Sequence, residues 1–243
     1  MKLFVLFLAI LINLCLPITM IFILSRKNIL RKKFIFFGFL QYGIGKVFLT
    51  LMNLFCRNMD LPNLLADTGM QVLLLAILTV GTKYILYERC YHIQTDSKAL
   101  SAGFGEAIME IFLHILPIAF NNLMYHALIA NGSIYQSIGD TISQAQVHAF
   151  IEQFTSYDGS YFLYTGLVCI MLIMIHMLSA ILIVRKKSLL LSFMLVLALF
   201  SVYYVIPLFS YAVCNIVILI LMCVFLVVLY NKSGSLICRK AYL

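Results

Sequence analysis

Two glutamates and a histidine recur at four-residue intervals in one long hydrophobic stretch: Glu106, Glu110 and His114. Positions four apart lie on the same face of a helix, so the three side chains share one side of the segment. Ionisable groups at membrane depth cost roughly 2.5–3.5 kcal/mol each to insert, and they mark functional paths or pair with one another. Carboxylate and imidazole groups can bind a metal ion, carry a proton or activate water. No other feature of the sequence constrains function as tightly.

The same helix face continues through Pro117 and Asn121. With about 100° of rotation per residue, both positions fall within about 60° of Glu106. Pro117 has no amide hydrogen and leaves the carbonyl of Leu113 without its helical partner, so we expect a kink there. The helix is therefore expected to present two carboxylates, an imidazole and an amide on one face.

Three polar side chains in other hydrophobic runs lie at a matching depth: Lys46, Lys83 and His176. With a rise of about 1.5 Å per residue, these groups and those of the stripe lie roughly 5–18 Å from the cytoplasmic boundary. Ionisable residues in membrane helices face the bundle interior and pair with one another. We predict a single polar cluster inside a helical bundle.

Three interpretations of this cluster stay open. In the first, the glutamates neutralise the two lysines and the network only fixes helix packing. In the second, a glutamate activates water, or Glu110, His114 and His176 hold a divalent ion such as zinc. In the third, the carboxylates bind or carry an ion or a peptide, while the lysines and Asn121 contact the substrate or form structural pairs. The catalytic candidates are Glu106, Glu110, His114 and His176.

Composition places the chain in lipid. Hydrophobic residues make up 64% of the 243 residues and charged residues 11%, which a soluble domain of this length could not bury. The net charge of +8 does not indicate a nucleic-acid partner, because the basic residues gather at the ends of the hydrophobic runs. We expect one integral membrane domain over residues 1–243, with the lipid bilayer as its partner.

Hydrophobic run length predicts an all-α bundle of seven transmembrane helices, at about 3–24, 34–55, 70–88, 103–127, 161–184, 188–207 and 210–230. With the N-terminus outside and the C-terminus cytoplasmic, 13 of the 17 Lys and Arg residues fall in cytoplasmic segments. The extracytoplasmic loop 131–160 contains no Lys or Arg. Helical spacing of its apolar residues predicts an amphipathic or partly ordered helix through Ile134, Ile138, Ile142, Ala145, Ala149 and Phe150.

Several segments together resemble the YhfC-type intramembrane peptidases of Firmicutes, a group near the glutamic-type intramembrane proteases. These segments read RKKFIFFGFLQYGIGKVF, KYILYER, SKALSAGFGEAIMEI and IHMLSAILIVRKK, and the resemblance covers most of the chain. It implies a polytopic membrane fold with a metallo- or glutamic-type peptidase site. Glu110 and His176 match residues of the family pattern.

The chain departs from that pattern at its centre. The family carries paired glutamates ahead of an arginine in the third span, whereas this chain has Thr79, Thr82 and Lys83 in that stretch. The Gly-x-Gly-His-Gly-x-x-Glu motif has Glu106 where the histidine would stand. Loss of the leading glutamates removes the group that would activate water.

The resemblance and the departures together favour an eroded, non-proteolytic relative in a bacterial plasma membrane. Such a protein would bind, or less readily process, a peptide segment within the membrane. The competing class is non-enzymatic: a membrane partner subunit, a peptide-immunity factor or a small transporter. Direct Glu–Lys pairing would favour the non-enzymatic class, and a water-filled cavity at Glu110 and His176 would favour chemistry.

Overall fold

The computed structural model describes residues 2–26, 28–58, 68–138, 143–185 and 189–224, and every regular element in this part of the chain is helical. Five helical stretches are long and apolar enough to cross a membrane, which confirms a membrane-compatible all-helical fold. They are α1 (Lys2–Arg26), the Lys32–Met52 part of α2 (Lys32–Asn58), the continuous stretch Asp96–Ala130, α9 (Gly159–Val184) and the stretch Leu189–Leu208 that contains α10 (Leu189–Tyr204).

Helices also form at the two remaining predicted spans, although they are not among these five. One is α4 (Thr68–Ile85), which continues as the π-helical turn η1 (Leu86–Cys90). The other is the apolar helix Tyr211–Val224. The predicted end of that last span, at 225–230, and the basic residues of segment 231–243 lie outside the described residues.

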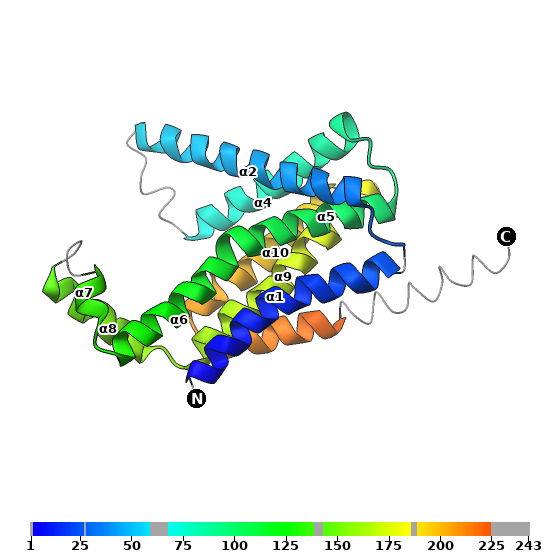
Figure 1. Cartoon of the computed structure of the whole chain (residues 1–243). Helices are drawn as coiled ribbons and strands as arrows, with labels where there is room; N and C mark the ends of the chain where they lie inside the picture. Colours follow the sequence, from blue (N-terminus) through cyan, green and yellow to red (C-terminus); the bar gives the residue numbers. More distant parts are fainter. Residues whose placement is uncertain (1, 27, 59–67, 139–142, 186–188, 225–243) are drawn as a thin grey trace.

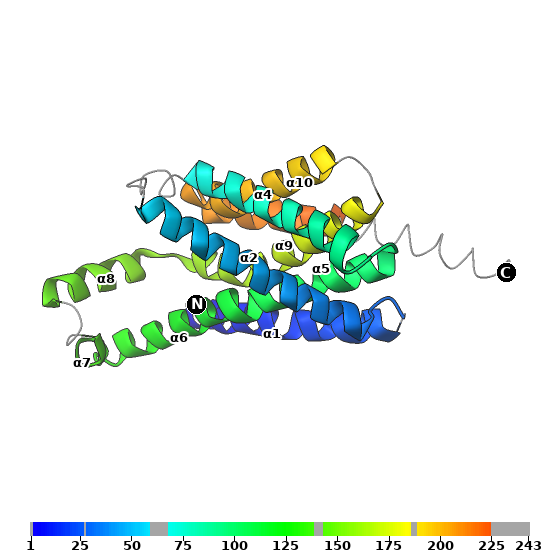
Figure 2. The same ribbon diagram turned by 90° about the horizontal axis from the view of Figure 1, so that it is seen from above.

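Helix α9 forms the centre of the bundle. It packs against α1, α5 (Asp96–Glu110) and α10, which run alongside it in Figure 1, and Figure 2 shows it between α10 and the α1–α5 layer. Most of its length is buried, in contrast to the other long helices. An all-round apolar sequence suits this position, because a central helix has no face turned to lipid.

Glycines on two sides of α5 set its distance from its neighbours. A methyl group at Gly103 would collide with the His176 carbonyl of α9, and one at Gly105 would collide with the Ile35 carbonyl of α2. Small residues allow membrane helices to approach closely. Helix α5 is therefore held tightly between α2 and α9, and this packing positions the polar stripe.

A π-helical turn, η2 (Ile111–Ile115), interrupts the long helix between α5 and α6 (Leu116–Ala130). Pro117 stands in the first turn of α6, directly after this π turn, and has no amide hydrogen to donate to the preceding turn. A π turn closes with i→i+5 bonds and so holds one more residue than an α turn. Every residue after η2 is shifted by about one position relative to a continuous α-helix.

The two ends of the bundle differ. The loops 28–31 and 91–95, each flanked by basic residues, lie at one end, and Arg185 pairs there with Asp96 (Figure 1). At the opposite end, α7 (Ile134–Ile138) and α8 (Gln144–Ser156) form a small unit that we call the α8 lobe. Lys2 Nζ donates a hydrogen bond to the Thr155 carbonyl at 2.7 Å and ties the start of α1 to this lobe.

The expected helix in the loop 131–160 exists in part, and its apolar face is confirmed at Ile134 and Phe150 but not at the two alanines. A capping box between Ser143 and Gln146 starts α8, and the buried positions are Val147 and Phe154. Ala145 and Ala149 are exposed. Residue 142 and the side chain of residue 138 lie outside the described set. The alanines were predicted on the buried face, whereas Val147 and Phe154 take those positions and bury more apolar surface.

Candidate functional site

Four ionisable side chains from three helices meet in the interior. Lys83 Nζ of α4 lies 2.9 Å from Glu106 Oε2 of α5 and 3.0 Å from His176 Nδ1 of α9. The imidazole stands between the two carboxylates, with Nδ1 at 3.2 Å from Glu106 Oε2 and Nε2 at 2.7 Å from Glu110 Oε2. We call this set, Lys83, Glu106, Glu110 and His176, the ion-pair cluster.

The donor inventory indicates one arrangement of protons in the cluster. The ammonium of Lys83 has only donors, so His176 Nδ1 accepts from it. We therefore assign the ring proton to Nε2, which donates to Glu110. Glu106 Oε2 receives no aligned hydrogen bond from the described residues, so Coulomb attraction holds it beside Lys83. In this state Lys83 and Glu106 neutralise each other, and the remaining negative charge lies on Glu110.

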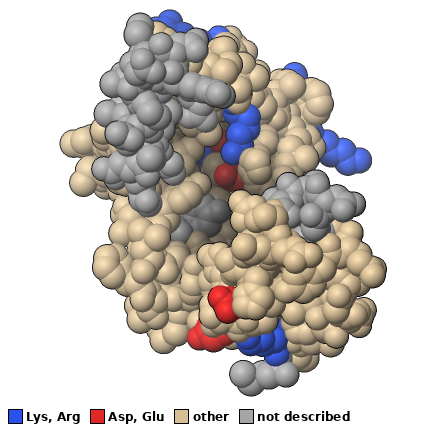
Figure 3. All heavy atoms as spheres, turned by 90° about the vertical axis from the view of Figure 1, so that its left-hand side faces the viewer, with Lys and Arg blue, Asp and Glu red and all other residues tan. Residues whose placement is uncertain are grey.

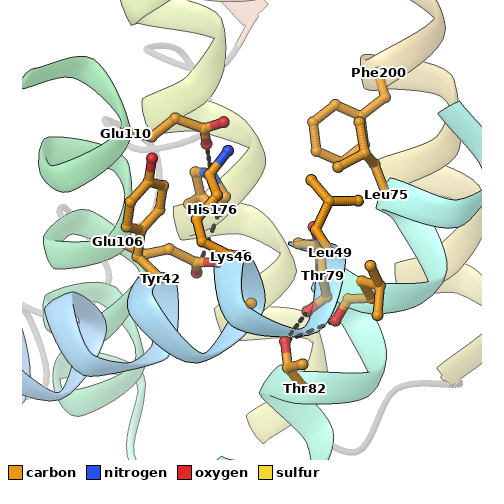
Figure 4. Close-up of a pocket in the computed structure, with 12 residues that line it drawn as sticks. Tyr42, Lys46, Leu49, Leu75, Thr79, Thr82, Glu106, Glu110, His176 and Phe200 are labelled. Carbon is orange, nitrogen blue, oxygen red and sulfur yellow. Dashed lines mark hydrogen bonds and ion pairs between the residues drawn. The ribbon is translucent and has the colours of Figure 1, made fainter. Parts of the chain in front are cut away.

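A cavity of about 50 Å³ borders the cluster, with lining residues from α2, α4, α5, α9 and α10. A cavity needs about 10–15 Å³ for each water molecule, so this one has room for a few. Figure 4 shows a polar wall of Tyr42, Lys46, Glu106, Glu110 and His176, and opposite it an apolar wall of Leu49, Leu75 and Phe200. The cavity therefore has one polar side and one apolar side.

The surface of the molecule is hollowed on the side of the α8 lobe (Figure 3). Basic and acidic side chains come to the surface at the upper wall of this hollow, and a second group of acidic and basic side chains lies below it. Among the residues of the cavity, Lys46 is half-buried, and its Nζ lies over the Tyr42 ring at 5.2 Å from the centroid. The carboxylate of Glu110 is 16% exposed, so it is the accessible acid of the cluster.

Two residues of the predicted stripe lie elsewhere. His114 and Asn121 are exposed, and the His114 ring lies 6.1 Å from the Tyr42 ring between centroids. The π turn is the reason, because it rotates the rest of the helix by about one residue. Asn122 instead takes the buried position that the continuous α-helix assigned to Asn121.

The predicted metal set is not assembled in the described part of the chain. No three His, Cys, Asp or Glu side chains there are placed to share a metal ion. His114 faces outward, and the interaction that joins Glu110 to His176 is a direct hydrogen bond. His114, which the i, i+4 spacing suggested as a second zinc ligand from the helix of Glu110, is therefore turned away from Glu110 and His176.

Some residues that line the cavity were not predicted as site residues. Tyr42 precedes Lys46 by four residues, so the i, i+4 rule could have placed both on one face of α2. Thr79 and Thr82 line the cavity from α4, with the Thr82 hydroxyl donating to the Leu78 carbonyl at 2.6 Å. Threonine hydroxyls in apolar helices commonly bond to a carbonyl of the preceding turn in this way, so the presence of a threonine in the sequence does not indicate a site.

No model of a protein family, no curated protein and no solved structure matches this chain. The functional interpretation therefore rests on the geometry of the ion-pair cluster and the cavity beside it. The resemblance to the YhfC-type peptidases stays a prediction from sequence motifs.

Proposed function

We propose that the protein is a multi-pass protein of a bacterial plasma membrane, with seven spans, its N-terminus outside and its C-terminus in the cytoplasm. Five helices have the length and apolarity that spanning requires, and the helices α4 and Tyr211–Val224 would complete the seven. The loops flanked by basic residues share one end, opposite the α8 lobe, as the positive-inside rule requires.

Within that membrane, we propose that it is an eroded relative of the YhfC-type intramembrane peptidases that binds a peptide segment without cleaving it. Thr79 and Thr82 line the cavity from the stretch in which the family carries its paired glutamates. Glu106 is held beside Lys83 and His176, so it is not free to activate water. Glu110 already accepts a hydrogen bond from His176.

The two walls of the cavity fit the chemistry of a peptide in lipid. Backbone amides within a membrane need hydrogen-bond partners, since lipid offers none. The Glu110 carboxylate can accept from a peptide N–H, and the Lys46 ammonium can donate to a carbonyl. The apolar wall around Leu49 and Phe200 can cover a hydrophobic side chain. One observation carries the proposal: the accessible carboxylate of Glu110 and the ammonium of Lys46 face an apolar wall, next to an ion pair whose charges neutralise each other.

Site-specific photocrosslinking in native membranes tests the proposal. A benzophenone amino acid at Leu49, which lines the cavity, should form an adduct with one defined membrane peptide. The same group at Phe48, an exposed neighbour on α2, should label lipid only. Identical lipid adducts at both positions would contradict peptide binding. They would favour a partner subunit or small transporter whose polar groups serve another purpose.

A further inference from the structure

A second cavity lies in the α8 lobe, apart from the ion-pair cluster. Its volume is about 170 Å³, and it is a half-open cavity bordered by α6, α8 and the region where α9 begins. Cavities of about 150 Å³ can admit a benzene ring, so this one has room for a single aromatic group. Its aromatic lining consists of Tyr125, Phe150, Phe154, Tyr157 and Tyr161.

The walls of this aromatic cavity are held by ring–ring contacts. Tyr125 meets Phe150 edge-to-face at 5.0 Å and 72°, and Tyr157 stacks on Tyr161 at 4.1 Å and 20°. Phe154 is buried against the Phe162 ring at 5.6 Å. Rings fixed in this way offer faces and edges to a guest ring, and such pairs prefer stacked or edge-to-face geometry.

An unpartnered donor also lines the cavity. Asn122 is only 6% exposed, and its Nδ2 makes no hydrogen bond with the described residues. The Tyr161 hydroxyl lies beside the amide, which has a second hydrogen to donate. A buried amide donor without a partner is costly, so a ligand that supplies an acceptor is favoured. No lining side chain carries a charge, which selects a neutral ligand.

We propose that this cavity is a subsite for an aromatic residue of the bound peptide, with a peptide carbonyl accepting a hydrogen bond from Asn122 Nδ2. The inference rests on the proposed peptide-binding function. Glu110 and Asn122 belong to one continuous helical stretch and lie about 18 Å apart along it. An extended peptide of about five or six residues spans that distance. The aromatic residue would therefore lie about that many residues from the segment at Glu110.

The neutral probe N-acetyl-tryptophanamide tests the subsite, because the protein has no tryptophan of its own and the indole signal is free of background. Fluorescence anisotropy of the probe is titrated with purified full-length protein in detergent, and with empty micelles as reference. Saturable binding is expected, and N-acetyl-tyrosinamide should displace the probe whereas N-acetyl-alaninamide should not. Loss of one hydrogen bond in Asn122→Leu should weaken binding roughly 2- to 12-fold. Asn121→Leu, at the exposed neighbour, should leave binding unchanged.

Each result supports or overturns one part of the proposal. Binding no greater than to empty micelles, or equal displacement by the alanine and tyrosine amides, would overturn the subsite without recourse to any variant. Equal affinity in the Asn122 and Asn121 variants would overturn the assigned hydrogen bond. A peptide adduct at Leu49 with no probe binding would refute the subsite alone. Probe binding with only lipid adducts at Leu49 would refute the peptide-binding function and leave a site for a small aromatic amide.

Discussion

Removing the Lys83 ammonium should be among the most destabilising single changes in the protein. At 2.9 Å from Glu106 Oε2 and with an effective dielectric constant of about 20, the pair attracts by about 6 kcal/mol. Desolvation of both ions offsets part of that gain, but Lys83→Met leaves Glu106 buried and uncompensated. We therefore expect a loss of about 3–5 kcal/mol in the free energy of unfolding.

The assay is unfolding of the purified protein in mixed micelles by titration with sodium dodecyl sulfate, followed by far-ultraviolet circular dichroism. The double variant Lys83→Met/Glu106→Gln removes both charges and should recover most of the lost stability. Lys46→Met is the matched control, since Lys46 is half-buried and borders the cavity, and it should cost less than about 1 kcal/mol. Equal losses for the two single lysine variants, or a double variant less stable than Lys83→Met, would refute the reasoning.

Other predictions concern the packing and the helix ends. Gly103→Ala should destabilise the protein by about 1–3 kcal/mol in the same titration, because the methyl group meets the His176 carbonyl, whereas Gly45→Ala meets nothing and should be neutral or slightly stabilising. Asp158→Ala should cost about 1 kcal/mol by removing the N-cap of α9. Hydrogen bonds from Ser160 and Tyr161 hold the pKa of Asp158 below its ordinary value. The charge of Asp158 therefore contributes stability above the unfolded-state pKa, and this contribution is lost as the pH falls through the lower folded-state pKa. Asp158→Asn should flatten that acid-side decline, and an unchanged pH profile would contradict the capping role.

The membrane helices and part of the polar cluster could be predicted from the sequence. Apolar run length identified membrane helices because every backbone group must be paired inside lipid. Equal depth in the membrane grouped Lys83, Glu106 and His176, which the structure brings together although they lie far apart in sequence. Depth is readable from sequence because the rise per residue of a helix is constant.

The direction in which a side chain points from the helix axis could not be predicted across the change from α-helix to π-helix. His114 and Asn121 were placed beside Glu106 by continuous α-helical rotation, and the π turn η2 moved them away. Such a turn depends on how the surrounding helices satisfy its backbone and has no simple residue code. The buried position of Asn122 follows from the same shift.

The most direct test of binding without cleavage is the mass of the peptide that crosslinks to the cavity. A benzophenone amino acid at Leu49 should capture an intact membrane peptide, with the same mass in the wild-type chain and in Glu110→Gln. A shortened peptide in the wild type that becomes full-length in Glu110→Gln would show that Glu110 takes part in hydrolysis, and it would contradict the account.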